Sequence, residues 1–395
     1  MKTAATHVTL DFPTATKYGP AEQQAAQSVL STGRLSDTAR GTPIATVEDA
    51  FAQLTGSAYA LSFNSGTAAL HAALHAAGAH PDAGVATSPL TWISAITAAF
   101  HAGSFPVLCD LERHTYHLSP AAAATANCSA VLVTHAYGTP APMDLYRTDV
   151  PVIEDCSHAH GAIHHGRPVG AWGTAGCFSL QDTKTVSGGE GGILTTSDRR
   201  IYEGAMLLGH HPHRLATEIA EPDLAALAAT GAAHKFRMSP IAAAIAAVQV
   251  ASLPQRMAAA EGNLATAHEV WQRQGTPLHI PPIGNNGKRG WYGVPLMLYD
   301  DAGEADEQLL DRLTAARVPV RRIYEDWLTS PLLQTPQAVR SFWPQITNWQ
   351  PPQPAEFPNY YHTRRHTIVL KIPMVDAPDY MQQVALALDT ILSRR

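Results

Sequence analysis

The feature that most limits the possible folds is a series of short apolar segments between residues 58 and 196. Nearly every segment ends in a polar residue or a glycine, and several show no alternation of polar and apolar positions. Strands of a parallel sheet have this pattern because helices bury both of their faces. The pattern predicts seven strands, at residues 59–63, 84–88, 105–110, 130–135, 151–155, 176–180 and 191–196.

A helix pattern follows the first predicted strand. The segment SGTAALHAALHAAGA begins with a serine suited to cap a helix, and Leu70 and Leu74 lie at helical spacing. Strands that alternate with helices build layered α/β domains. We therefore predict an α/β domain with a mostly parallel, seven-stranded sheet between helices.

A second region follows the helix-like segment 239–253. It contains a helix pattern with Leu309 and Leu313, and in the last helix apolar residues recur every three or four positions. Further strand-like segments lie at residues 293–299, 318–324 and 366–373. These elements predict a small α+β domain over residues 256–395, after a large domain that covers residues 1–255 and includes the N-terminal segment.

The segment between residues 330 and 358 lacks a clear pattern. It is rich in proline and glutamine and contains three aromatic residues, Phe342, Trp343 and Trp349. Two interpretations are equally open, namely a long loop beside a ligand site and a solvated insertion.

Charge and composition exclude several classes of protein. The net charge of −6 provides no basic field for nucleic acid or for an anionic membrane. Residues 1–20 lack the apolar core of a signal peptide, and polar residues interrupt the alanine-rich runs before these reach the length of a membrane span. The four cysteines show no Cys-x-x-Cys spacing and form no disulfide framework. We expect a cytoplasmic protein that binds no nucleic acid and no membrane.

Three of the predicted strands end in residues of complementary chemistry. The sequence SGT at residues 65–67 starts a helix, where free N–H groups and the helix dipole favour a phosphate. Asp155 ends a second strand, and Ser179 ends a third, shortly before Lys184 and a glycine-rich loop. Pyridoxal 5′-phosphate needs such a set, because its phosphate, its aldehyde and its ring nitrogen require a helix end, an amine and a carboxylate. Each feature alone is common, so the prediction depends on the ordered combination.

Five segments in this order carry a family resemblance: NSGTAALHAAL, PLTWISAITA, VTHAYGTPAPMD, VIEDCSHAHGA and FSLQDTKTVSGGEGG. The chain resembles the DegT/DnrJ/EryC1/StrS aminotransferases, which act on sugars and cyclitols and have the pyridoxal phosphate-dependent transferase fold type I. The segment HKFRMSPIAAAIAAVQV continues the match, and VPVRRIYEDWLTSPLLQ and VLKIPMV extend it more loosely into the small domain.

The resemblance implies roles for residues around the cofactor ring. Lys184 would form the Schiff base and move a proton between two carbons. Asp155 would pair with the pyridine nitrogen, and Trp92 would stack on the ring. His158 stands where many relatives have glutamine, and it would donate a hydrogen bond near the phenolic oxygen. Lysine at position 184 also favours transamination over the dehydration that relatives with histidine perform.

The resemblance also implies a phosphate site. Gly66, Thr67 and Ser179 would hold the phosphate. The family usually adds an asparagine from the neighbouring subunit, and Lys235 stands at its place, with His234 as the alternative. The resemblance therefore implies a homodimer with shared active sites.

The implied activity is transfer of an amino group from glutamine or glutamate to a keto-cyclitol or keto-sugar. The alternatives are another pyridoxal phosphate-dependent reaction and a regulator that binds the cofactor without turnover. Histidine clusters at residues 158–165 and 209–213 raise the question of a metal, but no partner with zinc-motif spacing accompanies them, and we expect none. Cys156 follows a buried strand, so we expect it to pack inside the protein and not to react.

Overall fold

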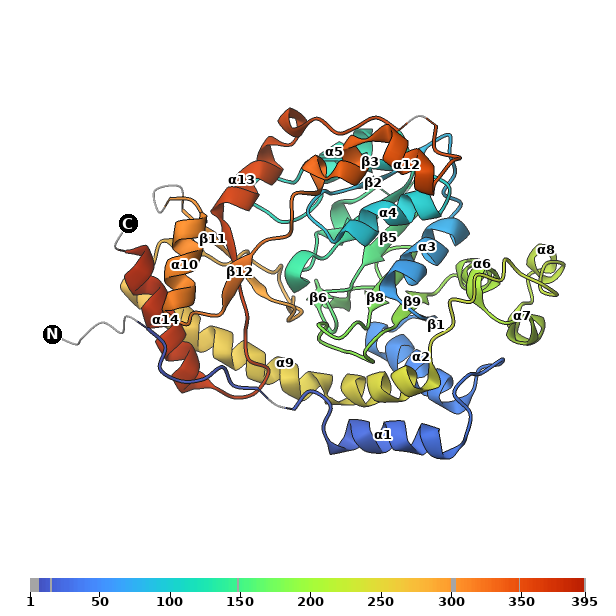
Figure 1. The fold of residues 1–395 in the computed structure, drawn as a ribbon, viewed down its shortest axis with the longest axis horizontal. Coiled ribbons are helices and arrows are strands. Elements are labelled where there is room, and N and C mark those ends of the chain that lie inside the picture. The colour runs from blue at the N-terminus through green and yellow to red at the C-terminus, as the bar shows by residue number, and fades with distance from the viewer. Residues whose placement is uncertain (1–6, 15, 148, 300–302, 348, 394–395) are drawn as a thin grey trace.

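The structure is a computed structural model that describes residues 7–14, 16–147, 149–299, 303–347 and 349–393. Its larger part is built on one sheet, and a smaller sheet lies beside it (Figure 1). Helix α9 runs along both parts and joins them (Figure 1).

The larger sheet has seven strands in the order β1-β9-β8-β5-β4-β2-β3. Strand β9 is antiparallel to both of its neighbours, and the other four pairs are parallel. This confirms the prediction of a mostly parallel sheet. The strands are β1 (Tyr59–Phe63), β2 (Gly84–Thr87), β3 (Pro106–Leu108), β4 (Cys128–Thr134), β5 (Val152–Asp155), β8 (Ala175–Ser179) and β9 (Gly192–Thr196).

Helices cover both faces of this sheet. On one face α3 (Gly66–Ala76), α4 (Ile93–His101) and α6 (Arg199–Gly209) share a core with Leu61, Cys177 and Leu194. The opposite face packs against α2 (Thr42–Thr55) and α9 (Pro240–Gln274) through Ala60, Phe178 and Ile193. Consecutive strand residues thus enter different cores, which explains why these strands are apolar without alternation.

The smaller sheet is antiparallel, in the order β10-β11-β13-β12. It packs on α10 (Glu307–Ala315), on α14 (Pro378–Leu392) and on the second half of α9. Val8 is also buried in this core, so the start of the described chain lies with the smaller sheet. The strands are β10 (Leu278–His279), which the sequence did not predict, β11 (Val294–Leu298), β12 (Val320–Arg322) and β13 (Thr367–Leu370).

Helix α9 is much longer than the predicted helix at residues 239–253. It continues through Pro254 to Gln274, because the residues after the proline are mostly good helix formers. The predicted domain boundary after residue 255 therefore falls inside α9, whose two halves enter the two cores.

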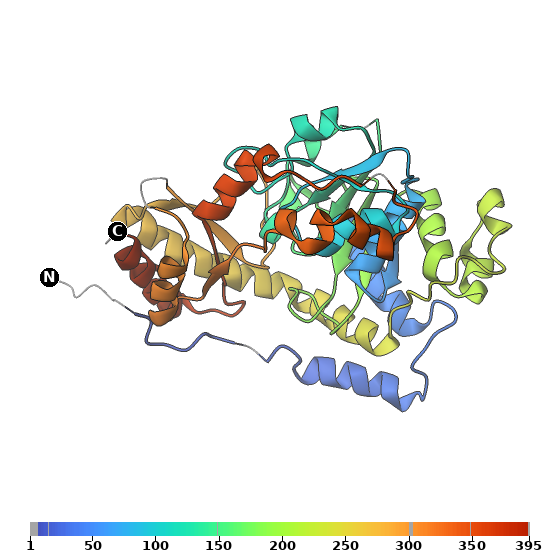
Figure 2. The ribbon, with the colours of Figure 1, turned by 45° about the horizontal axis from the view of Figure 1, so that its top comes forward.

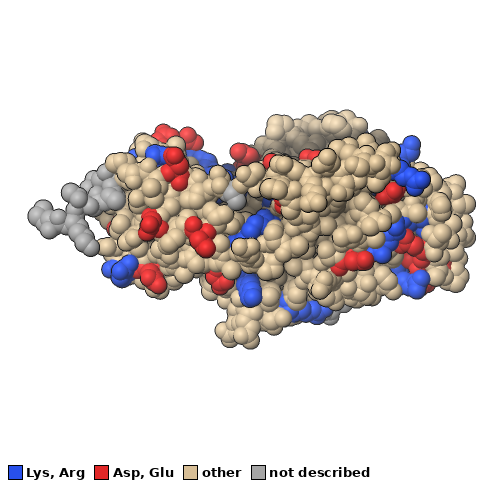
Figure 3. Space-filling view, turned by 90° about the horizontal axis from the view of Figure 1, so that it is seen from below, with Lys and Arg blue, Asp and Glu red and all other residues tan. Residues whose placement is uncertain are grey.

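In length and apolar composition, a window of α9 passes for a membrane span, and 33% of that window is buried. The helix packs against α1 (Pro20–Ser31), α2 and α14, as Figures 1 and 2 show. These three helices belong to both parts of the described chain, so α9 has packing partners along its length. On the face seen in Figure 3, the described Lys and Arg side chains lie interspersed with Asp and Glu.

The segment that follows β12 is neither a long loop nor a solvated insertion. It contains η4 (Trp327–Thr329), α11 (Pro331–Gln334), α12 (Pro336–Phe342) and η5 (Pro354–Glu356), and leads into α13 (Pro358–His366). Its apolar side chains pack on α4, where the Trp343 ring stacks on Phe100 with 4.8 Å between centroids. The proline-rich sequence concealed these short helices, since four of them begin with proline at the first turn.

The remaining elements are short and connect the larger parts. They are α5 (Pro120–Thr125), η1 (Ala136–Gly138), η2 (Met143–Leu145), β6 (Ile163–His164), β7 (Arg167–Pro168), α7 (Pro212–Glu218) and α8 (Pro222–Ala225).

Candidate active site

The carboxyl ends of β1, β5 and β8 lie at one edge of the larger sheet and bring three predicted features together. The Ser65 hydroxyl accepts the N–H of Ala68 at 3.1 Å and caps α3. Gly66 is the first residue of that helix, and a Cβ placed on it would lie 2.8 Å from the Ser179 Cβ. The N-terminus of α3, with Gly66 and Thr67, therefore lies directly against Ser179, and a side chain at position 66 would push the two apart.

Lys184 follows on the loop after β8. Its backbone N–H donates to the Gln181 carbonyl at 2.9 Å, and its side chain is half-buried at a cavity of about 840 Å³. Burial lowers the pKa of the amine, while Tyr292 and Asp155 raise it and Arg321 lowers it further. The net result is a pKa below the ordinary value of lysine, so the neutral amine is more populated than on an exposed lysine.

Asp155 is the last residue of β5 and is buried. One carboxylate oxygen accepts the Ser157 N–H at 3.0 Å, which fixes the side chain. Because its charge acts on both Lys184 and Tyr324, the carboxylate belongs to the same site as the lysine.

His158 is buried at the centre of an aromatic group. Burial lowers its pKa well below the ordinary value, and the charges of Lys184 and Arg321 lower it further, so the imidazole is neutral. Its Nδ1 accepts the backbone N–H of Tyr137 at 3.3 Å, which leaves the proton on Nε2. Nε2 forms a hydrogen bond with the phenol oxygen of Tyr324. The hydrogen bond expected from His158 to a cofactor is thus directed to a tyrosine in this structure.

Trp92 lies at the start of α4, near Tyr324, and is 50% exposed. Its ring centroid is 6.1 Å from Tyr324 and 5.5 Å from Trp327, which it meets edge to face. An exposed face of a large aromatic ring beside the buried tyrosines is available to a flat ligand.

Three residues of the site were not predicted. The Tyr292 ring stacks on His158 with 4.0 Å between centroids and 2° between planes, and the Lys184 Nζ lies 4.3 Å from the centre of the same ring. Arg321 lies over the Tyr292 ring, and Tyr324 bonds to His158. All three come from the region of the smaller sheet. The signal available in the sequence was the segment VPVRRIY, which places two consecutive arginines in a strand.

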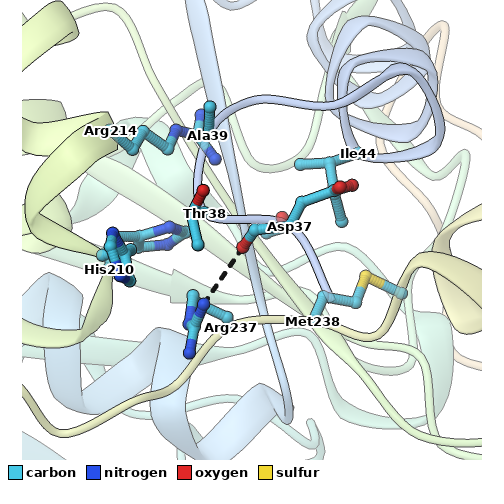
Figure 4. A pocket seen from close by; sticks show the side chains of 10 residues that line it. Asp37, Thr38, Ala39, Ile44, His210, Arg214, Arg237 and Met238 are labelled. Carbon is cyan, nitrogen blue, oxygen red and sulfur yellow. Dashed lines mark hydrogen bonds between the residues drawn. The ribbon is translucent and has the colours of Figure 1, made fainter. Parts of the chain in front are cut away.

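Lys235 is exposed and has a left-handed backbone conformation with φ 57°. The segment that carries Lys235 contacts its own chain beside the end of β1, because the Asn64 N–H donates to the Phe236 carbonyl at 2.6 Å. Arg237, two residues after Lys235, donates to the Asp37 carbonyl at 3.0 Å. Its side chain lines a small pocket together with His210 and other side chains (Figure 4). The backbone of this segment thus lies at the end of β1.

The histidine clusters separate in space. Among the described residues, Asp144, His164 and His165 have ligand atoms close enough together to hold a cation, as have His135, Glu154 and Cys156. The first group already contains a hydrogen bond of 2.6 Å between His164 Nε2 and Asp144, a neighbour that sequence spacing did not reveal. Cys156 is buried, and burial raises the pKa of its thiol well above the ordinary value, as expected for a cysteine that packs inside.

Two curated relatives are similar to part of this chain. An L-glutamine:scyllo-inosose aminotransferase of Streptomyces griseus is 42% identical over 160 residues, which are 38% of either protein. An L-glutamine:2-deoxy-scyllo-inosose aminotransferase of Streptomyces lividus is 37% identical over 209 residues, which are 48% of this chain and 49% of the relative. The chain spans half or less of the length of these relatives.

Solved structures match the whole fold. An aminotransferase from Psychrobacter cryohalolentis has a TM-score of 0.83 at 22% identity and covers 97% of this chain and 99% of its own. A 3-amino-5-hydroxybenzoic acid synthase has a TM-score of 0.80 at 23% identity, with 98% and 99% covered. These likenesses confirm the predicted fold type I. The family model of the DegT/DnrJ/EryC1/StrS aminotransferases matches residues 17–365, so this chain belongs to that family.

Proposed function

We propose that this protein is a pyridoxal phosphate-dependent aminotransferase that moves an amino group from glutamine or glutamate to a keto-cyclitol or keto-sugar. The observation that carries the proposal is the half-buried amine of Lys184, whose pKa is lowered and which shares its site with the carboxylate of Asp155. The names of the two Streptomyces relatives, which give L-glutamine and an inosose, support the choice of donor and acceptor.

The groups present fit pyridoxal phosphate. The phosphate would be held by the free N–H groups in the first turn of α3, by Thr67 and by the Ser179 hydroxyl. These groups are close together because Gly66, the first residue of α3, lies against Ser179. Asp155 would face the ring nitrogen, and Lys184 would meet the aldehyde. When bound, the cofactor supplies an aldehyde that combines with amines and a ring that withdraws electrons from the neighbouring carbon.

The side chains of this chain perform the remaining tasks. The lowered pKa of Lys184 favours the neutral form of its amine, and in this form the amine can attack a carbonyl carbon and can accept and return a proton. Asp155, fixed by the Ser157 N–H, would keep a proton on a nitrogen placed against it. Neutral His158 anchors Tyr324 and stacks on Tyr292, so the wall of the site keeps its shape without adding charge.

A half-reaction screen tests the proposal. The purified protein, reconstituted with pyridoxal phosphate, should be yellow and should lose this colour with L-glutamine or L-glutamate. Addition of the acceptor should restore the colour, and keto-inositols and nucleotide-linked keto-sugars are the panel to compare. A yellow protein that no amino acid bleaches would contradict the transaminase and favour a regulator.

Replacement of the lysine is the second test. Lys184→Ala should remove the yellow absorbance and lower turnover by several orders of magnitude, because the side chain loses both its nucleophile and its proton carrier. Circular dichroism should show an intact fold. Activity close to that of the wild type would contradict the assigned role.

We further propose a cytoplasmic homodimer in which Lys235 of one subunit serves the site of the other. The exposed side chain of Lys235, which is free to meet another subunit, supports this arrangement. We also propose that the chain divides into a large and a small domain within α9, because the halves of this helix belong to different cores.

A further inference from the structure

Three side chains of metal-binding type come together at the surface of the larger part. Asp144 lies in η2, and His164 follows 20 residues later at the end of β6, next to His165. One ligand atom of each lies within 4.8 Å of the ligand atoms of the other two. His164 is buried, whereas Asp144 and His165 are exposed, so an ion can enter from solvent. None of the three lines the cavity that contains Lys184.

A tight turn brings the two histidine rings together. His164 pairs with Arg167 across the hairpin of β6 and β7, and His165 and Gly166 form the turn between them. Both turn residues have a left-handed conformation, with φ 46° and 80°, as a two-residue hairpin turn of this kind requires. Consecutive residues of an extended strand point to opposite faces, but here the ring centroids of His164 and His165 are only 4.2 Å apart.

The contacts of His165 leave one ring nitrogen available to a metal ion. Its Nδ1 lies 3.2 Å from the Asn285 carbonyl oxygen, which can only accept, so the proton of the neutral ring is on Nδ1 and the lone pair is on Nε2. Histidines that bind metals usually direct their second nitrogen to a carbonyl in this way. The ring also lies against Gly284, where a Cβ would be 3.0 Å from the His165 Cε1. The orientation of the ring is therefore set before an ion arrives.

The other two ligands already lie side by side. His164 Nε2 is 2.6 Å from Asp144 Oδ1, and this contact lowers the pKa of the carboxyl group, as does the charge of His165. A tetrahedral ion with bonds of about 2.0–2.1 Å would hold these two atoms about 3.3 Å apart. The carboxylate of Asp144 is 45% exposed, so it can make this small movement when an ion replaces the proton between the two atoms.

Two other groups of such residues are less suited to an ion. Glu154, in the group with His135 and Cys156, already accepts several N–H groups of its own chain, and burial raises the pKa of the Cys156 thiol, which would have to lose its proton. The rings of His71 and His101 are 5.8 Å apart, and the second of them accepts the indole N–H of a tryptophan at 3.3 Å.

We infer that Asp144, His164 and His165 bind a divalent transition-metal ion such as Zn²⁺, with water as the fourth ligand. Two imidazole nitrogens and one carboxylate oxygen suit zinc, whereas Mg²⁺ and Ca²⁺ prefer oxygen ligands alone. The ion would join η2 to the hairpin of β6 and β7, and this hairpin holds the loop at residues 284–287 through Asn285 and through the Gly166 N–H, which donates to Asn286. Its role is thus to stabilise the structure, and it does not depend on the proposed aminotransferase activity.

Calorimetric titration of the holoenzyme with Zn²⁺, after a chelator has removed bound metal, tests the inference. The wild type should bind one ion per chain in its tightest site. His165→Asn keeps the hairpin, because Asn-Gly is the preferred sequence of this turn, but should weaken binding at least about 10-fold, since even loss of an outer-shell partner costs about 10- to 100-fold. His80→Gln is the matched control, because His80 lies 4.0 Å from Asp82 outside the proposed site, and it should stay within about twofold of the wild type.

A second measurement uses Co²⁺ as a probe of the ligands. The wild type and His80→Gln should show the strong visible absorbance of a four-coordinate cobalt ion, which excess Mg²⁺ does not remove. Asp144→Asn and His165→Asn should lack it, and circular dichroism should show that both variants are folded. Zn²⁺ should raise the Tm of the wild type and of His80→Gln but not of His165→Asn.

Three results would overturn the inference. They are the absence of Zn²⁺ binding by the wild type, equal binding by the wild type and His165→Asn, and a loss of binding in His71→Gln but not in His165→Asn. The last result would place the ion at the histidines of α3.

Discussion

At the scale of single residues, the consecutive carboxylates of β5 show how one strand serves two purposes. Their side chains alternate, so Asp155 faces Lys184 and Glu154 points away from it. Glu154 is fully buried and satisfied by four groups: the backbone N–H groups of Gly170, Trp172 and Gly173, each at 2.8 Å, and the His135 ring at 3.0 Å. One carboxylate thus organises a loop behind the sheet, and the other serves the site.

Substitution of these two residues should separate chemistry from stability. Asp155→Asn keeps the volume but removes the charge beside Lys184, so the half-reaction should slow by orders of magnitude while cofactor binding persists. Glu154→Gln should leave the chemistry of the folded protein within a few-fold of wild type but lower the free energy of unfolding by about 1–3 kcal/mol, because a buried partner is lost. Stopped-flow absorbance and urea denaturation measure the two effects. An Asp155→Asn enzyme within a few-fold of wild type would show that Asp155 is structural.

At the scale of elements, the packing of residues 331–357 on α4 fixes one wall beside Trp92. Trp349 is buried against Phe100, with 5.2 Å between ring centroids, and its indole N–H donates to the Leu333 carbonyl at 2.8 Å. A segment without long helices thus gains its order from aromatic contacts with a helix of the large sheet.

Trp349→Ala should therefore lower the free energy of unfolding by about 3–5 kcal/mol, because it leaves a cavity against α4. Phe342 provides a matched control in the same segment, since it is 70% exposed, and Phe342→Ala should change stability by less than about 0.5 kcal/mol. Urea denaturation of both variants measures the difference. Equal stabilities would show that the segment does not pack on α4.

At the scale of the whole molecule, buried histidines make stability depend on pH. His117, His160 and His210 are buried, and burial lowers the pKa of each to about 3 from an ordinary 6.5. The unfolded chain therefore binds more protons than the folded protein between these values, and stability falls as the pH falls below about 6.5. Each histidine contributes up to about 1.4 kcal/mol per pH unit in this window.

Urea denaturation between pH 7 and pH 5 should show this loss. When the free energy of unfolding is plotted against pH, His117→Gln should have a smaller slope than the wild type, because one titrating histidine is lost. The variant itself should be less stable than the wild type at pH 7. A slope equal to that of the wild type would show that His117 is not the titrating group.

The shared site of the proposed dimer is also a property of the whole molecule. A mixture of Lys184→Ala and Lys235→Ala subunits should recover part of the activity that each variant lacks, because one of the two sites in a mixed dimer is then intact. Native mass spectrometry would confirm exchange of subunits. The contact between Asn64 and Phe236 makes the opposite result informative, since no recovery after exchange would assign Lys235 to the site of its own subunit.

The sequence by itself determined the larger sheet and its mostly parallel pairing, and it predicted the amine and the carboxylate of the candidate site. Patterns over a few positions reveal features that depend on residues close together in the chain. Such features are the burial of the strands, the helix cap at Ser65 and the positions of Asp155 and Lys184 after strands. The helix nature of residues 331–342 and the length of α9 were missed, because prolines at helix starts and inside α9 resemble helix ends.

Only the tertiary structure decided which residues surround Lys184. Tyr292, Arg321 and Tyr324 reach the lysine from the region of the smaller sheet, more than a hundred residues away in the chain. Their position depends on how α9 joins the two cores, which is the sum of many long-range contacts and has no local pattern. For the same physical reason, the sequence could name the amine at the centre of the candidate site but not the arginine that lies beside it.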